Sequence, residues 1–219
     1  MLSLKTLPLA GIAALCLATG AHAQDAAQDN SRWFVHVGPA EMILAPTVKL
    51  TAGGQTVPGA AVSVPNTWTV EGEIGYFLNK DIAVAFAGGY PPVVTINGAG
   101  SLSALGKAGQ MQAGPSAFNL SYHFDRGGVV QPYIGAGFAF MIVWNTHDAA
   151  LTNLKVDDAI GPEVQAGADF MINKHWGAFV DYKRAWLDTT ARGDLGPAPV
   201  VAKVQLNPTV VNAGVTYRF

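Results

Sequence analysis

The last seventeen residues of the chain, Lys203 to Phe219, alternate between apolar and polar side chains. Counted back from the end, one parity is mostly apolar and the other mostly polar: Phe219, Tyr217, Val215, Ala213 and Val211 against Arg218, Thr216, Gly214 and Asn212. A β-strand turns successive side chains to opposite faces, so this stretch predicts a strand with one apolar and one polar face. The apolar face must be covered by a protein core or by lipid.

The residues at the end of this strand indicate that lipid, and not a protein core, covers the apolar face. Strands of a transmembrane barrel turn apolar side chains to the bilayer and polar ones to the lumen, with aromatic residues at both interfaces. The chain ends on Phe219, with Tyr217 two positions earlier. This pair resembles the C-terminal signal that the outer-membrane assembly machinery reads on bacterial barrel proteins. We therefore expect Tyr217 and Phe219 to be an assembly signal, and the barrel assembly machinery and periplasmic chaperones to be partners.

Residues 1–23 have the pattern of a cleaved secretory signal. Lys5 is followed by an apolar run and by the A-x-A site Ala21-His22-Ala23, which predicts cleavage before Gln24. The run is shorter than the ~20 residues of a membrane-spanning helix. A lipoprotein signal is an alternative because Cys16 lies here, but Leu15 stands where such signals have a small residue. The expected barrel domain, residues 24–219, then has no cysteine and no disulfide.

The charge composition excludes some classes of protein. Without Lys5, twelve basic residues remain against fifteen acidic ones, so a nucleic-acid-binding surface is not expected. Charged residues make up 13% of the chain, about half of the ~25% usual in soluble domains. The longest apolar run after the signal, Ile134 to Trp144, has eleven residues and is too short for a membrane helix. A closed β-barrel is the remaining way to cross a bilayer.

Eight segments after the signal alternate with a period of two, which predicts eight strands: Trp33–Ile43, Trp68–Leu78, Ile82–Tyr90, Ser116–Phe124, Gln131–Trp144, Ile160–Ile172, Trp176–Asp188 and Lys203–Phe219. The segments between them are alternately long and short. The sequence therefore predicts an all-β protein, an eight-stranded antiparallel up-and-down transmembrane β-barrel in the outer membrane of a Gram-negative bacterium. Short turns would face the periplasm and long loops the exterior.

The four long segments are rich in Gly, Pro, Thr and Ala, so we expect them to be loops: Leu44–Thr67, Asn97–Gly114, Asn145–Asp158 and Thr189–Ala202. A soluble barrel with the same strands would bury the parity that carries five carboxylates, at a cost of several kcal/mol for each unpaired charge. The membrane barrel is therefore favoured.

The inward parity collects most of the charges in the strands. We expect a salt-bridged plug that fills the lumen, because an eight-stranded barrel is only just wide enough for its side chains; its members are Glu71, Glu73, Glu163, Asp169, Asp181, Lys183 and Arg218. A catalytic or metal site is the alternative, with His36 and His123. Two histidines without a close second pair are a poor zinc signature. Ser121 and His123 share a face, but no G-x-S-x-G motif is present, so neither an enzyme nor a cofactor is expected.

Several motifs in order resemble the OmpW family of outer-membrane proteins, over nearly all of the chain after the signal: Trp33–Pro39, Ile74–Leu78, Gly98–Gly106, Leu120–Phe124, Gln131–Phe138, Gly161–Asp169 and Tyr217–Phe219. The resemblance implies an eight-stranded barrel that carries small hydrophobic molecules through a narrow hydrophobic channel with a sideways opening. The chain departs from the family pattern at Ala113-Gly114-Pro115, Asn207-Pro208 and Ala85. These departures leave the choice of ligand open.

The inward parity turns apolar toward the expected extracellular half. This change predicts a hydrophobic chamber above the plug, lined by Met141, Val143, Leu187, Val204, Leu206 and Val210. The alternative is that these residues pack against loops above the membrane. A ligand that meets a polar floor has to leave sideways, and proline interrupts strand pairing, so Pro91, Pro92 and Pro208 are candidates for a lateral opening.

Two functions remain in competition. The first is passive transport of small hydrophobic molecules through the chamber, with exit into the lipid of the outer membrane. The second is a structural or interaction barrel, such as an adhesin or receptor, that acts through its long loops. These loops are poor in the charged and aromatic residues that recognition surfaces favour, so transport is the preferred hypothesis.

Overall fold

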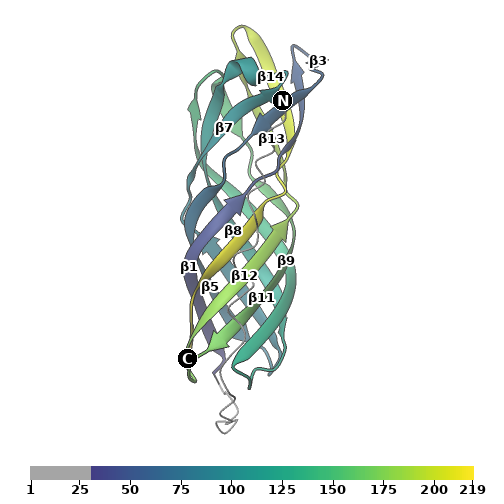
Figure 1. Cartoon of the computed structure of the whole chain (residues 1–219). Helices are drawn as coiled ribbons and strands as arrows, with labels where there is room; N and C mark the ends of the chain where they lie inside the picture. Colours follow the sequence, from purple (N-terminus) through teal and green to yellow (C-terminus); the bar gives the residue numbers. More distant parts are fainter. Residues whose placement is uncertain (1–30) are drawn as a thin grey trace, which may run out of the picture.

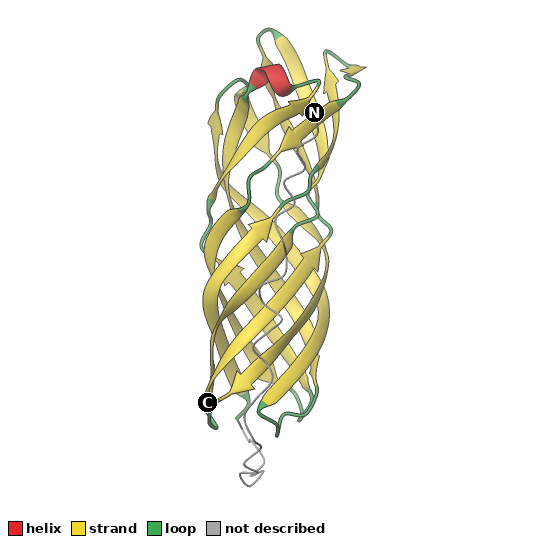
Figure 2. Cartoon of the chain, viewed as in Figure 1, coloured by secondary structure: helices red, strands yellow, loops and turns green. Residues whose placement is uncertain are grey.

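The computed structural model describes residues 31–219. The predicted signal, Cys16 and residues 24–30 lie outside the described part. Eight long strands form a closed antiparallel barrel (Figures 1 and 2): β1 (Trp33–Ile43), β5 (Thr67–Phe77), β6 (Ile82–Gly89), β8 (Lys107–His123), β9 (Val130–Asp148), β11 (Ala159–Met171), β12 (Trp176–Ala185) and β15 (Thr209–Arg218). This confirms the predicted fold class.

The first and last strands close the barrel. β1 pairs with β5 on one side and with β15 on the other, with Val35 opposite Tyr217 and Val37 opposite Val215. At the rim, the backbone N–H of Trp33 donates to the carbonyl of Phe219 at 3.2 Å, and the N–H of Phe219 donates back to Trp33 at 3.1 Å. The chain end is thus part of the β1–β15 ladder.

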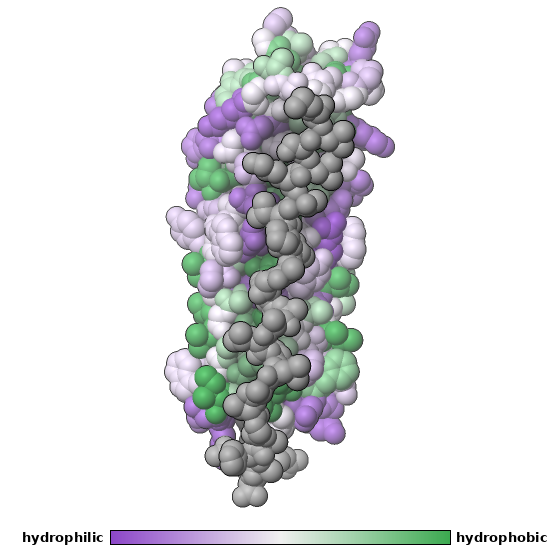
Figure 3. All heavy atoms as spheres, in the orientation of Figure 1, coloured by the Kyte–Doolittle hydropathy of each residue, from purple (hydrophilic) through white to green (hydrophobic). Residues whose placement is uncertain are grey.

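The outer surface of the barrel is apolar and the inner surface is polar or small. On β9, for example, Phe138 is 58% exposed whereas Tyr133 is 2% exposed. Hydrophobic residues gather over the lower half of the visible face, and hydrophilic residues become common above it (Figure 3). An apolar band of this kind around a closed barrel is the surface that a bilayer covers. Within residues 31–219, no helix is long and apolar enough to cross a membrane.

The prediction of four long loops was wrong. These segments form an upper tier of shorter strands that continues the wall beyond the barrel (Figure 2): β2 (Thr47–Ala52), β3 (Gln55–Thr56), β4 (Ala60–Ser63), β7 (Val93–Gly100), β10 (Thr152–Val156), β13 (Asp188–Leu195) and β14 (Ala198–Gln205), with the 3₁₀ turn η1 (Ser103–Leu105). Several of the glycines that favoured loops lie at tight turns with positive φ, such as Gly53, Gly54 and Gly196. The Thr, Val and Ala residues between the turns pair as strands.

Most strands are interrupted where the two tiers meet. The predicted strand Lys203–Phe219 is broken at Leu206-Asn207-Pro208, and Asn207 has a φ of 41°, so β14 and β15 are separate strands. Tyr90-Pro91-Pro92 separates β6 from β7 in the same way. Within the described residues, only β8 and β9 run through both tiers. The lower half of β8 pairs with β6 and its upper half pairs with β7.

Candidate functional site

The lumen of the lower barrel is filled by side chains that form ion pairs across it. Lys183 on β12 lies 2.7 Å from the Glu71 carboxylate and 3.4 Å from that of Glu73, both on β5, and also pairs with Asp181 on its own strand. All four side chains are buried. The ammonium group has three N–H donors, so three carboxylates can occupy all of them.

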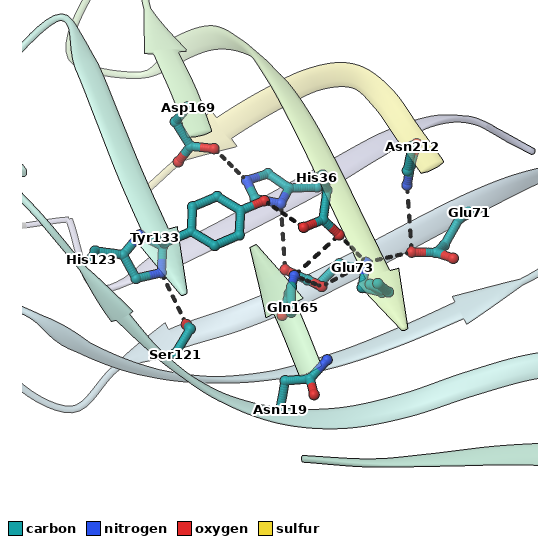
Figure 4. Close-up of polar contacts among 12 residues, drawn as sticks. His36, Glu71, Glu73, Asn119, Ser121, His123, Tyr133, Gln165, Asp169 and Asn212 are labelled. Atoms are coloured by element: carbon teal, nitrogen blue, oxygen red, sulfur yellow. Dashed lines mark hydrogen bonds and ion pairs between the residues drawn. The ribbon is translucent and has the colours of Figure 1, made fainter. Parts of the chain in front are cut away.

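A second ion-pair group lies nearer to the turn end of the barrel. Arg218 donates to Asp169 at 2.8 Å. His36 joins the two groups, because its Nε2 lies 3.0 Å from Asp169 and its Nδ1 lies 3.4 Å from Glu73. Figure 4 shows His36 between these two carboxylates. Six of the seven residues predicted to form the plug therefore lie in these ion-paired groups.

Glu163, the seventh residue predicted for the plug, differs from the other six in its partner. It is 6% exposed and accepts a hydrogen bond of 2.9 Å from Asn119, but no cation of residues 31–219 lies within ion-pair distance. It lies higher in the lumen than its neighbour Gln165, opposite Ala185 of β12 and Gly137 of β9. Glu163 is thus at the top of the plug.

Neutral side chains complete the network, and charge alone did not identify them. The Tyr133 hydroxyl donates to Asp181 at 3.2 Å, Gln165 donates to Glu73 and Asp181 at 3.2 Å each, and Asn212 donates to Glu71 at 3.4 Å. All of them lie on the inward parity of their strands, which was the available signal in the sequence. The network satisfies buried carboxylates that would otherwise be costly to desolvate.

The side chains of both candidate histidines contact buried polar side chains of the lumen. His36 is occupied by two carboxylates, and His123 lies 3.0 Å from Ser121 with both side chains buried (Figure 4). In the described part of the chain, no group of three or more His, Cys, Asp or Glu residues is arranged to hold a metal ion.

An apolar cavity of about 50 Å³ lies directly above the plug. Its floor includes Glu71, Glu163 and Lys183. Its walls include four residues expected in the chamber (Met141, Leu187, Leu206 and Val210), together with four that were not expected to line it (Met42, Val94, Met111 and Pro115). We call this space the lower cavity.

A second apolar cavity, of about 180 Å³, lies inside the upper tier. We call it the upper chamber. Nearly all of its lining is aliphatic, and Val204 is part of it. Val143 lines neither space and packs, partly buried, against the cluster around the lower cavity. Met111 and Leu206 line both spaces, so the lower cavity and the upper chamber meet at these two side chains.

The three prolines lie at the level where strands are interrupted. The carbonyl of Pro92 accepts from the Ala113 N–H at 3.3 Å, and the carbonyl of Pro91 accepts from the Gln112 side chain at 3.2 Å. The carbonyl of Pro208 accepts from the Ala185 N–H at 3.1 Å, and its ring faces the lower cavity. Two hydrogen bonds therefore join Pro91-Pro92 to β8, and next to the Pro208 contact the Leu206 N–H donates to the Leu187 carbonyl at 2.8 Å.

Tyr217 and Phe219 lie on the outer surface at the turn end of the barrel. Their rings are stacked with centroids 5.8 Å apart, and the Tyr217 ring also lies 4.5 Å from that of Trp176. These aromatic residues are at the position of the interfacial girdle of a membrane barrel.

Comparison with known proteins identifies the family. The OmpW family profile matches residues 31–219. The outer membrane protein AlkL of Ectopseudomonas oleovorans is 32% identical over 78% of this chain and 74% of that protein. The dibenzothiophene metabolism operon protein PahQ of Pseudomonas aeruginosa is 29% identical over 93% of this chain and 94% of that protein.

Solved structures show the same architecture. The crystal structure of OprG from Pseudomonas aeruginosa superimposes with a TM-score of 0.81 over 86% of this chain and 96% of that chain, and at 20% identity this shows the shared fold. The solid-state NMR structure of AlkL in lipid bilayers gives a TM-score of 0.68 at 28% identity over 93% of this chain and 97% of that chain. The chain therefore belongs to the OmpW family and is an outer-membrane β-barrel protein.

Proposed function

We propose that the barrel mediates passive transport of small hydrophobic molecules from the exterior into the bilayer, without catalysis. The main support for this proposal is the continuous apolar lining that runs from the upper chamber, past Met111 and Leu206, to the lower cavity above the charged plug. An apolar molecule gains free energy when it enters such a lining from water. It cannot continue downward, because a path through the plug would break buried ion pairs.

The exit in this proposal is lateral. The wall near the lower cavity has interrupted strands at Pro91-Pro92 and at Pro208, where a few hydrogen bonds replace a regular ladder. Breaking few hydrogen bonds opens such a wall at a lower cost than separating two paired strands. The ligand then enters the lipid that surrounds the barrel.

The relatives support an apolar ligand. The PahQ relative and the 29% identical protein DoxH of a Pseudomonas strain are both named for a dibenzothiophene metabolism operon. Dibenzothiophene is a flat apolar molecule. The signal cleavage before Gln24 and the dependence on the assembly machinery and periplasmic chaperones remain part of the proposal.

Uptake by whole cells tests the proposed function. We expect initial uptake of labelled octane and dibenzothiophene to be several-fold faster in cells that carry the gene than in cells that lack it. Leu206→Asp and Met141→Lys place a charge in the apolar passage, and both should abolish the difference. Val201→Asp is the matched control, because Val201 lies on the outward face of β14. Unchanged uptake in Leu206→Asp at equal protein level would overturn the proposal.

A further inference from the structure

The floor of the lower cavity contains a carboxylate, that of Glu163, whose hydrogen-bond acceptor positions are not all filled by protein donors of residues 31–219. Glu163 is 6% exposed and lines this cavity. One carboxylate oxygen accepts the hydrogen bond from Asn119, and no other protein donor of residues 31–219 is within hydrogen-bond distance. A carboxylate accepts about four hydrogen bonds through its two oxygens. Glu163 therefore retains acceptor capacity at the bottom of an apolar space.

The other charged groups at the floor are occupied. Lys183 is surrounded by Glu71, Glu73 and Asp181, which together match its three donors. Glu71 is paired with this lysine and also accepts from Asn212. Glu163 is the carboxylate at the floor without a cation partner among the described residues.

The route to this floor restricts what can reach Glu163. The lining of the upper chamber is aliphatic apart from Thr189, Arg192 and two glycines. A permanent positive charge would lose its hydration in this passage at a high cost, whereas a single hydroxyl group loses much less. The passage therefore admits a neutral molecule, and the floor offers an acceptor to a hydrogen-bond donor on that molecule.

Building on the proposed function, we infer that Glu163 binds the hydroxyl group of small amphipathic alcohols, which are a preferred ligand class of the lower cavity. The hydroxyl end occupies the lower cavity, and the alkyl chain extends between Met111 and Leu206 into the upper chamber, because the lower cavity of about 50 Å³ is too small to hold the whole chain. The hydroxyl group donates to the free acceptor position of Glu163, while Asn119 holds the carboxylate from the other side. An ether of the same size has no donor and lacks this contact.

Competition between two isomers tests this inference. 1-Octanol and methyl heptyl ether have the same atoms, and only the alcohol has an O–H group. The measured quantity is the concentration of each compound that halves gene-dependent uptake of labelled octane by whole cells. We expect 1-octanol to act at about tenfold lower concentration than the ether, the effect of a hydrogen bond to a charged group.

Substitutions test whether the preference for 1-octanol over the ether depends on Glu163. Glu163→Leu should make the two isomers equally effective, whereas Glu163→Gln retains an acceptor oxygen and should retain most of the preference. Glu41→Leu is the matched control, because Glu41 lies on the opposite parity of β1 to the buried Ala40 and Met42 and accepts from Asn66. A preference that survives in Glu163→Leu, or equal potency of the isomers in the unmodified protein, would overturn the inference. Absence of gene-dependent octane uptake would instead contradict the proposed function.

A second measurement does not depend on folding of the leucine variant. In unmodified protein reconstituted in lipid nanodiscs, infrared difference spectra should show a carboxylate change when 1-octanol is added and none with the ether. This change should be absent in Glu163→Gln. A 1-octanol spectrum that is the same in both proteins would contradict the contact.

Discussion

Arg218 of β15 donates a hydrogen bond of 2.8 Å to Asp169 of β11, and both side chains are about 1% exposed. The two strands are not neighbours, because β12 lies between them. The pair therefore connects separate parts of the wall through the lumen. It also ties the end of the chain to the plug.

Removing Asp169 should destabilise the barrel strongly. Asp169→Ala leaves the buried guanidinium of Arg218 and the ring of His36 without this carboxylate, and we expect a loss of about 3–5 kcal/mol in the free energy of unfolding. Urea titration of the protein in lipid bilayers measures the change. Asp81→Ala removes the exposed 3.8 Å contact with Lys80 and should change little. Similar effects of the two substitutions would show that the buried pair has no special role.

Charge on the outer surface should be costly in proportion to its depth. Phe138 is 58% exposed in the middle of the apolar part of β9, and Trp144 is 67% exposed near its upper end. We expect Phe138→Arg to cost about 2–4 kcal/mol and Trp144→Arg about 0–1 kcal/mol beyond the loss of the aromatic ring. Phe138→Ala and Trp144→Ala measure the cost of losing each aromatic ring, which is subtracted from the cost of the corresponding arginine variant. Equal costs for the two arginines would place the bilayer elsewhere on the barrel.

Close backbone packing requires glycine at position 137. A Cβ atom there would overlap the Phe118 carbonyl oxygen and the Asn119 side chain, whereas at Gly88 the nearest atom would be 3.7 Å away. We expect Gly137→Ala to cost about 1–3 kcal/mol through overpacking and Gly88→Ala to cost much less. Urea unfolding midpoints of both variants test the difference. A tolerated alanine at 137 would mean that β8 and β9 can move apart.

A covalent bridge across the proposed exit should slow delivery to the bilayer. Pro92 and Ala113 are joined by a backbone hydrogen bond of 3.3 Å, and the only cysteine of the chain, Cys16, lies in the predicted signal. We expect Pro92→Cys combined with Ala113→Cys to lower octane uptake when oxidised and to recover on reduction. Each single cysteine variant is the control. Full uptake through the oxidised protein would exclude this part of the wall as the exit.

Phe219 should matter for assembly more than for stability. The ring of Phe219 is 52% exposed and its backbone closes the barrel with Trp33. Phe219→Ala keeps these backbone hydrogen bonds, so we expect nearly unchanged urea stability in vitro but several-fold less protein in the outer membrane of cells. Leu78→Ala, at another exposed residue near the turns, is the control. Equal loss in both assays would indicate a structural role alone.

The period-two pattern predicted the eight membrane strands and their faces because a closed barrel separates lipid from lumen at every second residue. The same pattern is weak in the upper tier, where Thr, Ala and Gly replace the aromatic residues and the two faces of a strand differ little in polarity. Parity identified Val143 as inward but not its height, which depends on strand tilt and on the bulge between Gln112 and Ala113 of the β8–β9 ladder. Neutral residues of the plug, such as Tyr133 and Gln165, could not be predicted because their role depends on hydrogen-bond partners on other strands, and a sequence does not show which residues face each other across the lumen.

The interruption of most strands between the tiers has an evolutionary consequence. Because β8 and β9 alone among the strands of residues 31–219 continue through both tiers, insertions or exchanges in the other upper strands leave the registers of the membrane ladders unchanged. Selection can therefore alter the lining of the upper chamber while the bilayer-spanning wall and its ion-paired interior are inherited intact. Engineers who wish to exchange upper tiers between relatives have natural junctions at Pro46, Pro65, Pro92 and Pro208, which lie between β1 and β2, β4 and β5, β6 and β7, and β14 and β15.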